Sequence, residues 1–455
     1  MPAKSSKKKI EKVNVDALLA KANEPKENAA KYHPFYKGKI EITPKAPVRT
    51  FDDFAIWYSP GVAQPCLMIK ADKSQVFNLT NRWNTIAVIS DGTRVLGLGN
   101  IGPEAGLPVM EGKSMLFKFL GGVDAFPLCL GTKNRDEIIQ AVKWLQPSLG
   151  GVNLEDIESP KCYDILDTLR KELEIPVWHD DQQGTALVTV AGFINALKVV
   201  GKKMNEVSVA VVGAGAANSN IVKYLGVAGA DLKKFYVNDS KGLLNLSRLD
   251  SVKDNSAKVY LAKATNKEGR SGGLEESIKG ADAIIAASTP GPGVIKKEWV
   301  TKMADDAIIF ACANPIPEIW PWEAKEAGAR IVATGRSDFE NQVNNSLGFP
   351  AVFRGTLDVS AKTITDEMCI AGAYAVAKYA EKKGLTDNYI IPTMSETGMF
   401  IEEAVAVGLK AMEQGIARKK ISRKELEERA TEIITRAQAT TKLLMKNNII
   451  LPPPK

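Results

Sequence analysis

Histidine is scarce in this chain, with only His33 and His179 among 455 residues. Acid–base chemistry near neutral pH must therefore rely on lysine, tyrosine or carboxyl groups unless one of these two histidines is used. His179 belongs to a strand-like run whose alternation can point it into the core, so we interpret it as a structural residue.

Cysteine is sparse as well. The five cysteines are scattered and show no Cys-x-x-Cys spacing. This pattern indicates neither a disulfide framework nor a zinc site, and it is typical of a reducing compartment. The start of the chain lacks a secretory signal, and its first arginine, Arg49, comes after several acidic residues, which argues against an organelle presequence. We expect a cytoplasmic protein.

Long apolar runs and strongly charged blocks are also lacking. No apolar run approaches the roughly 18 residues of a membrane span, so we expect no membrane partner. The net charge of +7 is modest, and the run Lys7-Lys8-Lys9 has no aromatic platform beside it. That run predicts a solvated tail rather than an arm that binds nucleic acid.

What is present is an alternation of apolar runs and amphipathic segments, which predicts an α/β fold with a largely parallel sheet. The length and an apolar content of 45% allow two or three domains. In the first part of the chain, the predicted strands are 85–90, 124–130, 151–154 and a run up to 177, and the predicted helices are 135–145, 160–174 and 185–200.

Two acidic pairs follow neighbouring predicted strands. Glu155-Asp156 comes after the run 151–154, and Asp180-Asp181 comes after Ile175-Pro-Val-Trp-His. A helical stretch joins the two runs, so both pairs are expected at one edge of a parallel sheet. Converging carboxylates repel one another unless a cation or a buried base neutralises them, and oxygen-only ligands favour Mg²⁺ or Mn²⁺ over Zn²⁺. Acidic residues also cap helices routinely, but two pairs on adjacent strand ends favour the metal site.

A second α/β unit begins with a strand over 207–212 and the turn Gly213-Ala-Gly215-Ala216. Gly213 would allow a tight turn, and Gly215 the close approach of a pyrophosphate at the helix start. Asp239, at the end of the next strand, stands where a ribose-hydroxyl acceptor is expected. Asn218 replaces the third glycine of the fingerprint, so we expect the helix to pack more loosely or to be slightly displaced. Three further strands complete a Rossmann-type domain: 281–287, 306–312 and 330–334.

The rest of the chain, from 366 to 446, is predicted to be helical and amphipathic, and we expect it to pack on the other domains or on a partner subunit. The predicted division is a metal-binding N-terminal domain over 1–200, a Rossmann domain over 201–350 and a helical segment over 351–455.

With these motifs in place, the chain resembles the malic enzyme family over about residues 55–391, and its compact length is similar to the smaller, prokaryotic-type members. Asn100 stands where many members have aspartate. The matching segments are Tyr58-Ser-Pro-Gly-Val62, Asp91-Gly-Thr-Arg-Val-Leu-Gly-Leu-Gly99, Pro108-Val-Met-Glu-Gly-Lys113, Asn153-Leu-Glu-Asp-Ile157, His179-Asp-Asp-Gln-Gln-Gly-Thr-Ala186, Gly213-Ala-Gly215, Ala313-Asn-Pro315 and Asn341-Gln-Val-Asn-Asn345.

The resemblance implies that malate is oxidised at C2 by NAD⁺ or NADP⁺ and that the resulting β-keto acid loses CO₂ to give pyruvate. It implies that Glu155, Asp156 and Asp181 bind Mg²⁺ or Mn²⁺, which would act as a Lewis acid on the alkoxide and the enolate.

The resemblance also implies a proton-transfer pair, with Lys113 as the general base and Tyr58 as the acid that protonates the enol. A free lysine, with a pKa of about 10.4, is a poor base, so desolvation and the metal must lower its pKa. Asp180 is expected to contact Lys113 and tune it. Considered alone, Lys113 would be a surface lysine at a helix start and Tyr58 a turn aromatic.

Malate's remaining carboxylate needs hydrogen-bond donors. Arg94 can offer a bidentate fork, and Asn314 and Asn345 can donate amide hydrogen bonds. Asn314 is also expected beside the cofactor, although asparagines serve equally well in turns and caps.

Cofactor choice is open. Asp239 would repel the 2′-phosphate of NADP, which favours NAD. Ser240 and Lys241, directly after Asp239, could instead bind that phosphate. The positive charge of Lys241 favours NADP slightly.

We expect a homodimer from the family and from the helical tail. Two other functions stay open: an oxaloacetate decarboxylase that needs no cofactor, and a non-catalytic nucleotide-binding subunit. Retention of Tyr58, Lys113 and all three implied ligands disfavours the latter.

Overall fold

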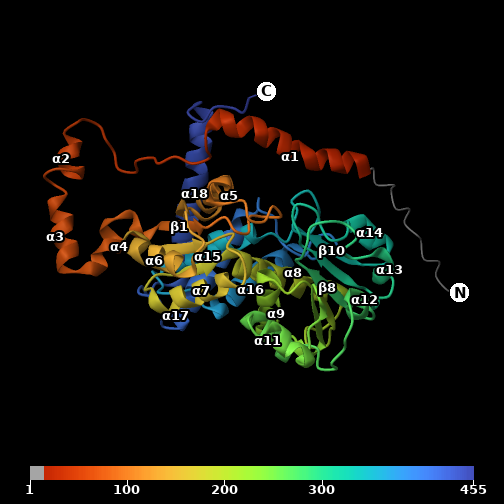
Figure 1. The fold of residues 1–455 in the computed structure, drawn as a ribbon. Coiled ribbons are helices and arrows are strands. Elements are labelled where there is room, and N and C mark those ends of the chain that lie inside the picture. The colour runs from red at the N-terminus through yellow and green to blue at the C-terminus, as the bar shows by residue number, and fades with distance from the viewer. Residues whose placement is uncertain (1–14, 455) are drawn as a thin grey trace.

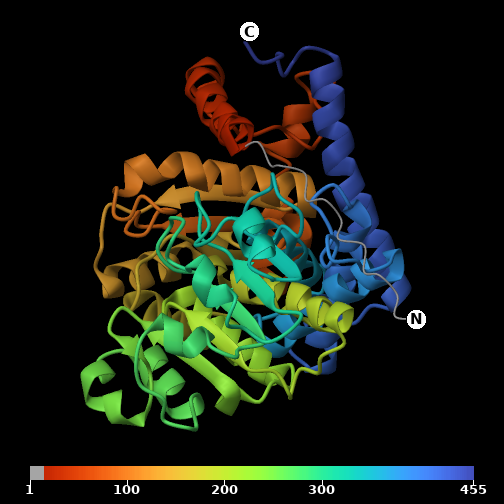
Figure 2. The same ribbon diagram turned by 90° about the vertical axis from the view of Figure 1, so that its right-hand side faces the viewer.

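The computed structural model describes residues 15–454, which form one parallel and one largely parallel sheet, both surrounded by helices. In Figure 2 the elements of the first sheet lie above those of the second, and α18 (Arg423–Lys446) runs along the upper right, where it packs on the helices beside the first sheet. The predicted α/β class, with a parallel N-terminal sheet, a Rossmann-like domain and C-terminal helices, is confirmed.

The first sheet has four parallel strands in the order β2-β1-β3-β4. Its core strands read as continuous apolar runs because helices cover both faces. The strands are β1 (Thr85–Ser90), β2 (Asp124–Cys129), β3 (Gly151–Leu154) and β4 (Val177–His179). The helices that connect them are α5 (Pro103–Gly121), α6 (Arg135–Leu145) and α7 (Lys161–Glu172).

The unit β3-α7-β4 positions the two acidic pairs. Leu154 is paired with His179 in the parallel register, so the residues that follow both strands emerge at the same edge of the sheet. β4 extends to His179, two residues beyond the predicted end, because both Trp178 and His179 are fully buried there. The chain then makes one wide π-type turn, Asp180–Gly184, before α8 (Thr185–Val200). Such turns occur often at functional sites.

The segment Asp180–Val200 corrects the prediction that no run approaches a membrane span. It is long and apolar enough by length and composition, but 72% of the qualifying window is buried. α8 packs against α9 (Ala216–Val227) and α16 (Asp366–Lys383). It is therefore a core helix of the folded protein.

The second sheet has six strands in the order β10-β9-β8-β5-β6-β7, and only the β6–β7 pair is antiparallel. The strand order reverses between β5 and β8, and the crevice at the carboxyl ends of such strands is where dinucleotides bind. The strands are β5 (Val209–Val212), β6 (Phe235–Asp239), β7 (Gly242–Leu243), β8 (Ala283–Ala286), β9 (Ile308–Ala311) and β10 (Ile331–Thr334). Short helices in this region are α10 (Leu249–Val252), α11 (Ser256–Ala264), α12 (Leu274–Ile278), α13 (Lys297–Val300) and α14 (Pro321–Glu326).

The C-terminal helices pack back onto both parts of the molecule. α15 (Phe349–Asp358) and α18 contact α5, and α16 contacts α8 and α17 (Thr397–Glu413). One continuous apolar cluster joins α5, α8, the second sheet and these helices. The predicted domain boundaries at 200 and 350 stay predictions.

An N-terminal arm, residues 37–80, precedes the first strand, and its helices α2 (Asp53–Trp57) and α3 (Ala63–Ala71) project away from the body in Figure 1. α1 (Val15–Tyr36) lies next to the end of the chain, where the Tyr36 hydroxyl donates to the Leu451 carbonyl at 2.7 Å. α4 (Val76–Leu79) joins the arm to the body. The remaining single turns are η1 (Lys73–Gln75), η2 (Asn81–Trp83), η3 (Gln146–Ser148), η5 (Leu232–Lys234), η6 (Leu246–Arg248) and η7 (Asn345–Leu347).

Candidate active site

The three carboxylates predicted as metal ligands come together in the structure. Ligand oxygens of Glu155, Asp156 and Asp181 all lie within 4.8 Å of one another. Glu155 and Asp156 are only 3% and 4% exposed, while the Asp181 side chain is 34% exposed. The backbone N–H of Asp156 donates to Asp181 Oδ2 at 2.9 Å, which links the ends of the two strands.

The carboxylates of this cluster repel one another when they are ionised. Burial, together with the neighbouring carboxylates, raises the pKa of Glu155 well above its ordinary value. Burial and the charge of Asp181 raise the pKa of Asp156 to about 8. A divalent cation would offset this cost, since it favours the ionised form of each ligand.

The donor set fits a hard cation. All three groups are carboxylates, and the buried Asp156 Oδ2 has no hydrogen-bond partner. Oxygen donors of this kind suit Mg²⁺ or Mn²⁺. His179 Nδ1 lies 3.7 Å from Asp181 Oδ2, but the ring is fully buried and burial lowers the pKa of His179, so it is neutral and belongs to the core as predicted.

Lys113, on α5, points into the same cluster. Its Nζ lies 2.5 Å from Asp180 Oδ2 and 3.1 Å from Glu155 Oε1, and the residue is 8% exposed. The predicted contact with Asp180 is therefore present. The lowering of the lysine pKa by desolvation and a metal together stays a prediction: of the protein's own groups, burial lowers the pKa of Lys113, but the charges of Asp180 and Glu155 outweigh burial and raise it.

Three residues that support this cluster escaped the sequence reasoning. Trp178 Nε1 donates to Asp180 Oδ1 at 3.0 Å, and Asn153 Nδ2 donates to Glu155 Oε2 at 2.8 Å. Both stand two residues before the first acid of a pair, which was the available signal. The buried ring of Phe349, at the start of α15, lies with its centroid 4.4 Å from Lys113 Nζ, and no local pattern marks it.

Among the described residues, no hydrogen bond or ion pair joins the side chains of Arg94, Asn314 or Asn345, predicted to bind the substrate carboxylate, to the three clustered carboxylates. The Arg94 backbone N–H donates to the Asp156 carbonyl at 3.0 Å, and its side chain is exposed. A Cβ on Gly184 would lie 3.2 Å from Asn345 Cβ and would clash with Asp180, so the glycine lets Asn345 approach. Asn314 is exposed at the carboxyl end of β9, where its Nδ2 would lie 2.7 Å from a Cβ on Gly335.

Tyr58 is not part of this cluster within the described chain. It follows α2 on the projecting arm, is 72% exposed, and no hydrogen bond or ion pair joins its side chain to Lys113 or the carboxylates. Figure 1 shows α2 well away from the sheets that hold the cluster. By contrast, Lys113 and Asp180 lie directly beside the carboxylate cluster.

The dinucleotide turn has the predicted geometry, with one correction. Gly213 has a φ of +101°, and Gly215 precedes α9, which begins at Ala216. Asn218 does not loosen the packing: it is fully buried, and its Nδ2 donates to the carbonyls of Val212 at 2.8 Å and Gly213 at 2.9 Å. The side chain fills the place that a glycine would leave open and satisfies carbonyls at the end of β5.

Asp239 ends β6 as expected, but two cations already hold it. Arg248 binds both carboxylate oxygens, at 2.8 and 3.1 Å, and Lys258 Nζ lies 3.0 Å from Oδ2. Burial would raise the pKa of Asp239, but the hydrogen bonds from Arg248, the Lys241 backbone and Lys258 overcome it and lower the pKa to about 2. Neither Arg248 nor Lys258 was predicted, because they lie nine and nineteen residues after Asp239, beyond the strand that bears it, and no motif marks them.

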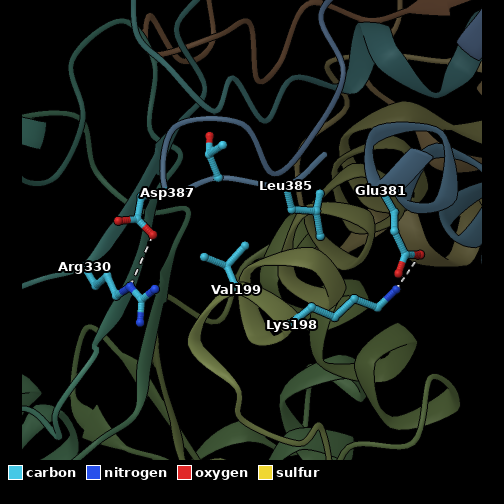
Figure 3. A pocket seen from close by; sticks show the side chains of 7 residues that line it. Lys198, Val199, Arg330, Glu381, Leu385 and Asp387 are labelled. Carbon is cyan, nitrogen blue, oxygen red and sulfur yellow. Dashed lines mark hydrogen bonds and ion pairs between the residues drawn. The ribbon is translucent and has the colours of Figure 1, made fainter. Parts of the chain in front are cut away.

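A surface pocket of about 530 Å³ lies elsewhere, between the ends of α8 and α16 and the start of β10. Figure 3 shows that its charged side chains pair with each other, Lys198 with Glu381 and Arg330 with Asp387. It contains none of the predicted site residues.

The chain matches two family models, "Malic enzyme, N-terminal domain" over residues 37–170 and "Malic enzyme, NAD binding domain" over residues 182–414. It is 48% identical over 408 residues to the bifunctional malic/malolactic enzyme of Bacillus subtilis (strain 168), covering 90% of this chain and 98% of the relative. It is 48% identical over 382 residues to the NAD-dependent malic enzyme of Geobacillus stearothermophilus, covering 84% and 78%.

Relatives differ in the cofactor that their names state. An Escherichia coli (strain K12) relative, 42% identical over 413 residues, is named an NADP-dependent malic enzyme, and the match covers 87% of this chain and 54% of that one. The crystal structure of an Entamoeba histolytica malic enzyme superposes with a TM-score of 0.95 at 44% identity, covering 98% of this chain and 93% of that one.

A carboxylate cluster with a buried lysine beside a Rossmann-type domain defines the class of NAD(P)-dependent oxidoreductases that act with a divalent metal. Within that class, the chain belongs to the malic enzyme family, whose members oxidise malate and decarboxylate the product. The predicted family and activity are confirmed, and the two alternatives, a cofactor-independent decarboxylase and a non-catalytic subunit, are set aside. Membership of the family shows that the enzyme uses NAD or NADP, and the relatives include enzymes named for each of the two cofactors.

Proposed function

We propose that Glu155, Asp156 and Asp181 bind Mg²⁺ or Mn²⁺ and that Lys113 and Asp180 move the protons of malate oxidation. When bound, the metal would act as a Lewis acid on the substrate oxygens. The observation that carries this proposal is the position of Lys113 Nζ, 2.5 Å from Asp180 and 3.1 Å from Glu155, with all three residues buried.

In this proposal, Lys113 accepts the proton of the malate hydroxyl. The ammonium must first lose its own proton, and Asp180, at 2.5 Å, is the nearer of the two carboxylates in reach, Glu155 being a proposed metal ligand at 3.1 Å. A cation that shares Glu155 would reduce the negative charge that now holds the proton on Lys113. Arg94, Asn314 and Asn345 are proposed to donate to the substrate carboxylates, with Asn314 also beside the cofactor.

Tyr58 is proposed to protonate the enol in the site of a second copy of the chain. Support comes from the arm that bears it, because large apolar side chains there are exposed, including Phe51 at 91% and Leu67 at 59%. An apolar surface of this kind favours association. A symmetric homodimer would let each arm complete the other copy's site.

NADP is the proposed cofactor. Arg248 and Lys258 surround Asp239, so two cations face one carboxylate where the adenosine ribose is expected. A 2′-phosphate would find donors there, with Lys241 nearby in the sequence. A cytoplasmic location is also proposed, supported by five free cysteines.

The test is absorbance of the reduced nicotinamide with purified protein, malate and Mn²⁺, with NAD⁺ and NADP⁺ side by side. We expect faster reduction of NADP⁺, pyruvate as product, and loss of activity with excess chelator. Lys113→Ala should remove turnover while leaving dinucleotide binding unchanged. Activity that persists in the chelator or in Lys113→Ala would overturn the proposed roles.

A further inference from the structure

Glu318 is a buried carboxylate that the chemistry above does not use. It lies between β9 and α14 with 0% exposure. Within residues 15–454, no lysine, arginine or histidine forms an ion pair with it, whereas most buried carboxylates have such a partner. Burial raises the pKa of Glu318, and hydrogen bonds from Ala313 and Ser288 partly offset this cost of ionisation.

Its oxygens accept hydrogen bonds from two loops. Oε1 accepts from the Ser288 backbone N–H at 2.8 Å and from the Ser288 hydroxyl at 3.1 Å, and Oε2 accepts from the Ala313 N–H at 3.1 Å. Ser288 follows β8 and Ala313 follows β9. The two loops are also joined through their backbones, since Gly291 N–H donates to the Ile316 carbonyl at 3.3 Å.

These loops lie at the carboxyl edge of the second sheet and contact a loop of the N-terminal part of the chain. Gly97 lies against both: a Cβ there would be 2.8 Å from the Asn314 carbonyl oxygen and 3.2 Å from Pro290 Cγ. Gly97 follows Arg94 in the loop whose backbone contacts Asp156. The carboxylate therefore sits behind the contact between the metal-binding and dinucleotide-binding parts.

We infer that Glu318 is a positioning residue that clamps the loops after β8 and β9, so that Asn314 and the nicotinamide side of the crevice keep the geometry needed for hydride transfer. A carboxylate suits this task because it accepts from both loops at once. The side-chain amide of glutamine has an acceptor oxygen and a donor NH₂ group, so its NH₂ group would face one of the two backbone N–H donors and lose that hydrogen bond. The inference rests on the proposed role of Asn314.

Glu318→Gln tests the clamp, and Glu403→Gln is its matched control. Glu403, on α17, is also 0% exposed, but neither of its oxygens has a hydrogen-bond partner in the described chain. In Glu318→Gln we expect kcat/KM for malate to fall about tenfold or more, because hydrogen bonds to a buried charged acceptor are lost. Glu403→Gln should keep wild-type kinetics.

A second readout separates positioning from general destabilisation. ADP, which has no nicotinamide, should bind Glu318→Gln with close to the wild-type Kd, while the reduced dinucleotide binds more weakly. Unchanged kinetics in Glu318→Gln, or an equal loss of ADP and dinucleotide binding, would overturn the inference.

Two further variants keep the result decisive. If Glu318→Gln does not fold, Glu318→Asp, one methylene shorter, should give kinetics between those of wild type and inactivity, and wild-type kinetics there would reject the clamp. Asn314→Ala tests the underlying role separately. Wild-type activity in Asn314→Ala would refute the Asn314 proposal, whereas an impaired Asn314→Ala with a normal Glu318→Gln would refute the clamp alone.

Discussion

Replacing Lys258 by alanine should change the cofactor preference of this enzyme. Lys258 Nζ lies 3.0 Å from Asp239 Oδ2, and its side chain is 26% exposed. If the 2′-phosphate of NADP binds here, Lys258 donates a charge-assisted hydrogen bond to it. The 2′-hydroxyl of NAD offers no such charge.

The magnitude follows from that single hydrogen bond. A hydrogen bond to a charged group contributes about 1.5–3 kcal/mol, which corresponds to a loss of roughly 10- to 150-fold in kcat/KM for NADP. For NAD we expect a change of less than about twofold, because Arg248 still holds Asp239. The Lys258→Ala substitution should therefore reverse or abolish the preference.

The assay is initial-rate kinetics with each dinucleotide at saturating malate and Mn²⁺. Lys263→Ala is the control, because Lys263 is exposed on the same helix and its replacement removes the same charge. Equal losses for both cofactors, or no loss for NADP, would refute the assignment of Lys258 to the phosphate.

Three other outcomes are expected. Tyr58→Phe and Lys113→Ala should each be inactive alone, but mixing the two variants should restore about a quarter of wild-type activity. About half of the dimers that form at random are hybrids, and in each hybrid one of the two sites combines an intact Lys113 with an intact Tyr58 from the other copy. No restoration would place Tyr58 in its own subunit's site. Asn218→Ala should raise the Kd of the dinucleotide about three- to tenfold in a fluorescence titration, because carbonyls beside the Gly213 turn lose their donor, and an unchanged Kd would contradict this. Relative to wild type, Glu403→Gln should stabilise the protein more as the pH rises, because burial raises the pKa of Glu403. Above the unfolded pKa, about 4.3, the unfolded chain releases a proton that the folded chain retains. The free energy of unfolding of wild type therefore falls by up to about 1.4 kcal/mol per pH unit until the folded pKa is passed. Urea unfolding at pH 5 and pH 7 measures this, and an equal stability difference at both pH values would contradict it.

Strands and crossover helices could be predicted from the sequence because their apolar periodicity is local. The range predicted for β1, residues 85–90, matches the structure, as do the ranges predicted for α6 and α8. The convergence of Glu155, Asp156 and Asp181 was also predictable, since parallel register alone brings the ends of β3 and β4 together.

Long-range partners could not be predicted in this way. Phe349 reaches Lys113 from a helix more than two hundred residues along the chain, and Arg248 and Lys258 reach Asp239 through tertiary packing. The first helix, α1, was also missed, because Pro25 and Pro34 interrupt its pattern. The sign of the Lys113 pKa shift depends on two carboxylates whose distances only the fold determines.

Glu155, Asp156 and Asp181 are proposed to hold the divalent metal that malate oxidation requires. The most direct test is the rate of NADP⁺ reduction as a function of Mn²⁺ concentration, for wild type and Asp181→Asn. The account predicts that wild type saturates and that Asp181→Asn needs at least about tenfold more Mn²⁺, if it turns over at all. An identical Mn²⁺ dependence for the two proteins would contradict it.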